Sequence, residues 1–165
     1  MRAGYERASS LDAALGRVGE LSARTVVFDI EPLVAYWDTG QDALERGVAL
    51  IVQRAAQLPQ VQLVCFATNS KRRPQDVPSS TRVRVVYLAS AGKPMRIAPY
   101  RDFPRPGVVV GDQIATDGLL ARRLGYTFVQ YRPAPDEIPA GPRLLGQLGR
   151  LVRPVAFRRA GQSPR

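Results

Sequence analysis

Five short runs of apolar, mostly β-branched residues, separated by segments with helical periodicity, constrain the fold of this chain more than any other feature. The runs cover residues 25–30, 61–68, 83–89, 107–112 and 126–131. Near-continuous apolar runs are typical of strands that are buried on both faces, and their alternation with helices is typical of a parallel sheet with crossover connections. We therefore predict an α/β fold, a three-layer sandwich in which helices cover both faces of a mostly parallel, five-stranded sheet.

The segments between these runs carry the predicted helices. Residues 42–57 place an apolar stripe at helical spacing, formed by Leu44, Val48, Ile51, Val52 and Ala55. Residues 116–124 predict a second helix, with Leu119, Leu120 and Leu124 facing inward and Gly125 ending it. We also expect an early helix over residues 10–21, and only a short helical piece within 94–101 because prolines interrupt that stretch.

Length and composition fit one domain with a basic extension. The chain has 165 residues, 45% of them hydrophobic, and no apolar run approaches the ~20 residues that a membrane-spanning helix needs. We assign residues 1–135 to the folded domain and residues 136–165 to an extension that is partly helical and then disordered. Residues 141–165 hold six arginines and no acidic residue. This extension is expected either to contact an anionic membrane or nucleic acid, or to pack on the sheet as an ordinary helix.

The residue types that are missing exclude several kinds of site. The chain has no histidine and a single cysteine, Cys65, so it cannot build a Cys/His zinc site or a catalytic system that needs Cys or Ser together with His. Any metal is expected to be one that prefers oxygen ligands. The first residues include Arg and Glu where a secretory signal would be apolar, so we expect a cytoplasmic protein.

Polar residues follow the predicted strands at the edge of the sheet where ligands bind in folds of this class. They are Asp29, Glu31, Thr68, Asn69, Lys93, Asp112, Thr116 and Asp117. Carboxylates crowded at one edge repel one another, so we expect a divalent cation that offsets their charge. Oxygen ligands alone suit Mg²⁺, and Mg²⁺ in turn indicates a ligand that contains phosphate.

The order of four short motifs resembles that of a known family. Asp-Ile-Glu stands at residues 29–31, ATNS at 67–70, GKP at 92–94 and VVGDQIATD at 109–117. In this order the motifs resemble those of the haloacid dehalogenase (HAD) superfamily. The last stretch is similar to the small capless phosphatases of the YqeG type, relatives of the mitochondrial phosphatidylglycerophosphate phosphatases. The resemblance covers about residues 10–135 and implies a Rossmann-like domain without a cap domain.

The resemblance implies a Mg²⁺-dependent phosphomonoester hydrolase. Asp29 would be the nucleophile that forms an aspartyl-phosphate, and Glu31 would be the general acid and base. Thr68 would bind the transferring phosphoryl group, and Lys93 would neutralise its charge. The implied Mg²⁺ ligands are Asp29, Glu31 through its backbone carbonyl, Asp112 and Asp117.

The expected substrate is a phosphorylated molecule large enough to cover the site itself. Too few residues separate the first three motifs to hold a cap domain, so the open site suits a bulky phosphate ester, such as a lipid or a macromolecule. Lys71 and Arg72 follow Thr68 closely and, with Asn69, are the candidate substrate-binding residues. The sequence leaves the oligomeric state open.

Two alternatives stand beside the phosphatase. The chain has Glu31 where the family has a second Asp, and Pro32 and Leu33 replace the Asn and Thr of the family. The extra methylene moves the carboxyl of Glu31 by roughly 1 to 1.5 Å, and a displacement of ~1 Å can cost about a hundredfold in rate. The first alternative is therefore a catalytically weak or inactive fold that binds a phosphorylated ligand or partner. The second is a nucleic-acid-associated protein that acts through its arginines.

Overall fold

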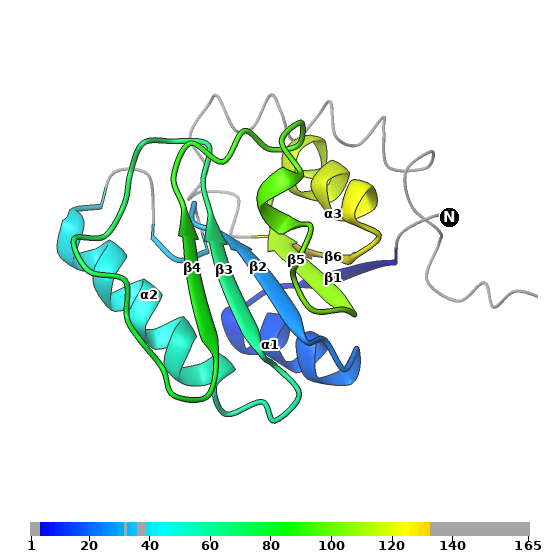
Figure 1. The fold of residues 1–165 in the computed structure, drawn as a ribbon, viewed down its shortest axis with the longest axis horizontal. Helices are drawn as coiled ribbons and strands as arrows, with labels where there is room; N and C mark the ends of the chain where they lie inside the picture. Colours follow the sequence, from blue (N-terminus) through cyan, green and yellow to red (C-terminus); the bar gives the residue numbers. More distant parts are fainter. Residues whose placement is uncertain (1–3, 32, 36–38, 133–165) are drawn as a thin grey trace, which may run out of the picture.

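The computed structural model describes residues 4–31, 33–35 and 39–132 (Figure 1). The strands are β1 (Tyr5–Ala8), β2 (Thr25–Asp29), β3 (Leu63–Ala67), β4 (Arg84–Leu88), β5 (Gly107–Gly111) and β6 (Thr127–Tyr131). The helices are α1 (Leu11–Glu20), α2 (Gln41–Ala55) and α3 (Leu119–Leu124), with a 3-10 turn, η1 (Ala98–Tyr100), and a π-helical turn, η2 (Ile114–Gly118). This alternation confirms the predicted α/β class.

The strands form one sheet in the order β1-β6-β5-β2-β3-β4, and each of its neighbouring pairs is parallel. All five predicted strands are present, but the predicted strand number was wrong because the sheet has a sixth strand, β1. This strand lies at the edge beside β6 and buries only Tyr5 and Ala8, with the charged Glu6 and Arg7 between them. It therefore has no apolar run by which the sequence could reveal it.

Helices cover both faces of the sheet, and the described residues are consistent with a Rossmann-like fold. On one face α1 and α2 pack against the strands, and the whole stripe predicted for α2 is buried there: Leu44, Val48, Ile51, Val52 and Ala55. On the other face α3 and η1 cover the alternate strand residues, among them Val27, Cys65 and Val109. The two cores hold the central strands rigidly between them.

The predicted ends of the helices agree with the structure to within two residues, and one predicted α-helix begins with a π-helical turn. Helix α3 ends at Leu124 and is capped by Gly125, as predicted; the φ of Gly125, 69°, is one that glycine adopts without strain. The helical segment before it begins at Ile114 rather than at residue 116, as the π-helical turn η2. Leu120 and Leu124 are buried as predicted, whereas Leu119 is only partly buried.

The direction in which the chain crosses the sheet reverses between β2 and β5. From β2 the chain continues to β3 and β4 on one side, and it then returns to β5 and β6 on the other. Such a reversal opens a crevice at the carboxyl ends of the two central strands, which is where parallel α/β sheets bind ligands. Asp29 ends β2 and Gly111 ends β5, so the residues after both strands meet at this crevice.

The predicted basic extension, residues 136–165, with its amphipathic helix and disordered end, lies outside the described residues. Among the helices that the structure does describe, none has both the length and the apolar character needed to cross a bilayer.

Candidate active site

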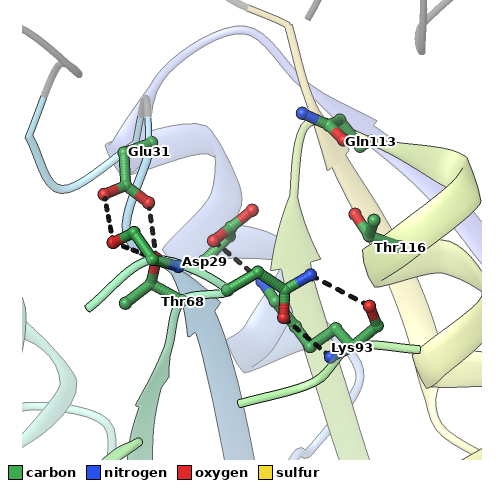
Figure 2. A pocket seen from close by; sticks show the side chains of 8 residues that line it. Asp29, Glu31, Thr68, Lys93, Gln113 and Thr116 are labelled. Carbon is green, nitrogen blue, oxygen red and sulfur yellow. Dashed lines mark hydrogen bonds and ion pairs between the residues drawn. The ribbon is translucent and has the colours of Figure 1, made fainter. Parts of the chain in front are cut away.

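A pocket of about 170 Å³ opens at the crevice between the central strands. Its lining residues come from the segments that follow β2, β3, β4 and β5 (Figure 2). They are Asp29, Glu31, Thr68, Asn69, Ser70, Lys93, Gln113 and Thr116. The structure thus brings together predicted site residues from three of the four sequence motifs, and the fourth motif contributes Gln113 and Thr116.

Lys93 is the positive charge at the floor of this pocket. Its Nζ lies 2.8 Å from Asp29 Oδ1 and 2.7 Å from Asp117 Oδ1, and all three residues are buried. Burial by itself would lower the pKa of Lys93, but the carboxylates of Asp117 and Asp29 together outweigh burial and raise it above its usual value. Lys93 therefore stays charged and fixes two carboxylates at once.

Three aspartates gather around this ammonium group. One carboxylate oxygen each of Asp29, Asp112 and Asp117 lies within 4.8 Å of the other two. Burial, followed by the charge of Asp117, raises the pKa of Asp29 well above its usual value despite the presence of Lys93. The same two causes raise the pKa of Asp112 to about 7. When all three are ionised, one ammonium cannot balance them, so the cluster favours a further positive charge.

The donor set fits a hard divalent cation. Asp112 Oδ1 is buried and has no hydrogen-bond partner among the described residues, although buried carboxylate oxygens are normally bonded. This oxygen and the neighbouring Asp29 offer oxygen-only ligands of the kind that Mg²⁺ takes. Asp117 binds Lys93 through one oxygen, and its other oxygen accepts the backbone N–H of Gln113 at 3.3 Å. Asp29, Asp112 and Asp117 are the residues that could hold the ion, and Asp117 also holds Lys93.

Two further features hold the aspartates in place. Position 111 requires glycine because a Cβ atom there would overlap the carboxylate of Asp117. Gln130 of β6 donates from Nε2 to the backbone carbonyl of Asp112 at 2.9 Å, and its Oε1 accepts the Tyr5 hydroxyl at 2.6 Å. The edge strand β1 thus supports the position of Asp112 through one intervening side chain.

Glu31 lies beside Thr68 on one side of the pocket (Figure 2). The Thr68 hydroxyl donates to Glu31 Oε2 at 2.9 Å, and Ser70 Oγ lies 3.5 Å from Glu31 Oε1. The carboxylate of Glu31 is not part of the group formed by the three aspartates. The predicted metal role of Glu31 therefore depends on its backbone carbonyl. Its side-chain carboxylate is available for the predicted role in proton transfer.

Protein-family models, curated proteins and solved structures were compared with this chain. None matches it.

The three predicted substrate-binding residues have different surroundings. Asn69 accepts the Lys93 N–H at 2.7 Å and donates to the Lys93 carbonyl at 2.9 Å, so its amide clamps the loop that carries Lys93. Arg72 donates to the carbonyl and the hydroxyl of Thr39, at 2.7 and 3.1 Å, close to the start of α2. Lys71 is exposed. Substrate contact remains a prediction for these three residues.

Three lining residues were given no predicted role: Ser70, Gln113 and Thr116. Each is adjacent to a residue that had one, since Ser70 follows Asn69, Gln113 follows Asp112 and Thr116 precedes Asp117. Their position after a strand end was the available signal. Because Ser, Gln and Thr are common in loops of every kind, that signal carries little weight by itself.

Proposed function

We propose that this chain is a Mg²⁺-dependent phosphomonoester hydrolase of the HAD type, which acts through an aspartyl-phosphate on Asp29. The observation that carries the proposal is the 2.8 Å pairing of Asp29 with Lys93 in the pocket, next to the unbonded carboxylate oxygen of Asp112. A carboxylate can attack a dianionic phosphate only where fixed cations cancel the repulsion between them. Lys93 supplies one such charge, and the aspartates favour a second.

Two hydrogen bonds orient the nucleophile for the first step. Lys93 Nζ and the backbone N–H of Ile30 both donate to Asp29 Oδ1, each at 2.8 Å, so Oδ2 is the oxygen that would attack phosphorus. The Oδ2–P bond forms while the bond from phosphorus to the leaving oxygen breaks, and protonated Glu31 gives its proton to that oxygen. Mg²⁺, when bound, offsets negative charge on the phosphoryl oxygens.

The second step releases inorganic phosphate. Glu31, now ionised, takes a proton from a water molecule as the water oxygen attacks phosphorus. The Oδ2–P bond breaks, the phosphate leaves, and Asp29 and Glu31 return to their starting states. In both steps the Thr68 hydroxyl donates to a phosphoryl oxygen, and Lys93 holds Asp29 in position.

The proposed substrate class is a bulky phosphate ester, such as a phospholipid or a phosphorylated macromolecule. Among the described residues, the segment between Asp29 and Thr68 contains a single helix, α2, and the segment between Thr68 and Lys93 contains a single strand, β4. The described parts of these two segments are thus too small to hold a cap domain, which supports an open site. The body of a large substrate would then exclude water from the reacting groups.

The contact between Glu31 and Thr68 favours a second candidate function, a catalytically weak or inactive fold that binds a phosphorylated ligand or partner. A hydroxyl group can donate one hydrogen bond, and that of Thr68 donates to Glu31 Oε2 at 2.9 Å. The phosphatase needs that same proton on a phosphoryl oxygen. The two candidate functions therefore differ in whether the contact opens when phosphate binds, and turnover separates them.

Phosphate release from para-nitrophenyl phosphate in Mg²⁺ tests the proposal. We expect turnover by the natural chain, a loss of about a thousandfold or more in Asp29→Asn, and arrest by excess EDTA. Glu31→Asp is expected to raise turnover, because it places the shorter acid at a position where the resembled family has aspartate. Circular dichroism checks that each variant is folded. Absence of release from both the natural chain and Glu31→Asp would reject the phosphatase in favour of the binding function.

A further inference from the structure

The hydroxyl groups of Thr68 and Ser70 lie next to different oxygens of the Glu31 carboxylate. Thr68 Oγ1 is 2.9 Å from Oε2 (Figure 2). Ser70 Oγ is 3.5 Å from Oε1. The two hydroxyl oxygens are 3.0 Å apart. The three side chains therefore form one hydrogen-bonded group.

The hydroxyl protons of this group are too few to hydrogen-bond both the Glu31 carboxylate and a bound phosphate through Thr68 during the proposed reaction. The single hydroxyl proton of Thr68 is required on a phosphoryl oxygen once a phosphate enters the pocket. Glu31 then loses its nearer donor, and Ser70 is the other hydroxyl in contact with its carboxylate. Ser70, the more distant hydroxyl donor in the free protein, would then be the donor that holds the Glu31 carboxyl group during proton transfer.

The backbone around Ser70 fixes its hydroxyl for this task. The Ser70 N–H donates to Thr68 Oγ1 at 3.0 Å, and the Ser70 carbonyl accepts the Ser90 N–H at 2.8 Å. Ser70 Oγ accepts the Arg72 N–H at 3.2 Å. Because that N–H occupies an acceptor position, the proton of Ser70 points away from it, toward Thr68 or Glu31.

The length of Glu31 is what brings its carboxylate within reach of Ser70. Removing one methylene would withdraw the carboxylate by roughly 1.5 Å, the length of one C–C bond. The contact to Ser70 is already 3.5 Å long and would be lost. The hydroxyl of Ser70 can therefore contact the carboxylate of a glutamate at position 31 but not that of an aspartate.

We propose that Ser70 is a positioning residue for Glu31, whose carboxyl group it holds for proton transfer after a phosphoryl group has taken the Thr68 hydroxyl. This inference rests on the proposed phosphatase function. Ser70 lies in the pocket but is exposed, so its substitution by alanine is expected to leave the fold intact.

A double-mutant cycle on the full chain tests this role with two substrates. Glycerol 2-phosphate has a poor leaving group that needs the proton of Glu31, whereas the leaving group of para-nitrophenyl phosphate needs little protonation. We expect Ser70→Ala to lower kcat/KM about tenfold for glycerol 2-phosphate and less than about twofold for para-nitrophenyl phosphate. In the Glu31→Asp background, Ser70→Ala is expected to have less than about a twofold effect on either substrate. Ser70→Thr keeps the hydroxyl and is expected to restore activity toward glycerol 2-phosphate.

The melting temperatures of the same proteins without Mg²⁺ give a readout that does not depend on turnover. Ser70→Ala is expected to lower the melting temperature more in the natural chain than in the Glu31→Asp background. Equal losses for the two substrates, or equal losses in the two backgrounds, would overturn the role of Ser70 and leave the phosphatase standing. Absence of Asp29-dependent turnover in both the natural chain and Glu31→Asp would instead reject the proposed function, and this inference with it.

Discussion

Asp112→Asn is expected to stabilise the metal-free protein while removing a proposed metal ligand. Asp112 Oδ1 is buried and unbonded among the described residues, and burial together with the charge of Asp117 raises the pKa of Asp112 from 3.8 to about 7. A carboxyl with a raised folded-state pKa binds its proton more tightly in the folded chain than in the unfolded chain. Its ionisation therefore costs stability progressively as the pH rises between these two values, and the full cost is present above the folded-state pKa.

The size of this cost follows from the two pKa values. At about 1.4 kcal/mol per pKa unit, the difference between 3.8 and about 7 corresponds to at most about 4.5 kcal/mol. Asp112 is partly accessible to solvent, which screens its charge, so we expect a gain of roughly 2 kcal/mol in the free energy of unfolding. For a chain of this size the gain corresponds to a rise in Tm of about 4 to 8 °C at pH 8.

Thermal unfolding in EDTA, followed by circular dichroism at pH 8 and pH 5, measures this gain. At pH 5 the folded natural chain keeps Asp112 protonated, so the advantage of Asp112→Asn is expected to fall to less than half. Adding Mg²⁺ at pH 8 is expected to raise the Tm of the natural chain and not that of the variant. Asp102→Asn, at an exposed position, is the matched control and is expected to change little. A Tm of Asp112→Asn at or below that of the natural chain at pH 8 would refute the reasoning.

Three further variants test individual contacts. Lys93→Met leaves two buried carboxylates without their ionic partner and is expected to lower the free energy of unfolding, measured in urea, by about 3 to 5 kcal/mol. The control Lys71→Met changes an exposed residue and is expected to cost less than about 0.5 kcal/mol. Similar costs for the two variants would contradict the ion-pair assignment. Asn69→Ala removes the clamp on the Lys93 loop and is expected to lower kcat for para-nitrophenyl phosphate about tenfold, while a change in KM alone would show that Asn69 binds substrate instead. Tyr5→Phe loses the 2.6 Å bond to Gln130. This change is expected to cost about 1 kcal/mol of stability and to weaken Mg²⁺ binding in calorimetric titration, and an unchanged affinity would show that β1 does not support the site.

The central part of the fold was predictable because burial on both faces leaves a strong sequence signal. All residues of β2, β3 and β5 are buried, and each strand reads as a continuous apolar run. The edge strand β1 has water on part of its surface and carries charged residues, so nothing in its composition separates it from a loop. Topology also added what composition could not, since only the strand order places the crevice between β2 and β5.

The candidate site was predictable at the level of residues but not of contacts. Strand ends located Asp29, Thr68 and Asp112, because parallel strands bring their carboxyl ends to one edge. The clamp of Asn69 on Lys93 depends on the path of the loop after β4, which turns through positive φ angles of 50° at Ser90 and 67° at Gly92. Periodicity carries no information about such a path. For the same reason the sequence could not show which hydroxyl groups hold the Glu31 carboxylate.

The pairing of β1 with β6 also sets the order in which a newly synthesised chain can complete its site. Tyr5 pairs in register with Phe128, and the hydrogen bond between Tyr5 and Gln130 joins residues 125 positions apart. Contacts between such distant residues form slowly, since the entropy of closing a long loop is lost before the contact repays it. Among the described strands β1 is synthesised before β6, so the two cannot pair until β6 has left the ribosome. The backbone of Asp112 gains the support of Tyr5 through Gln130 only when β1 and β6 pair, so we expect this edge of the candidate site to form after the central strands have assembled.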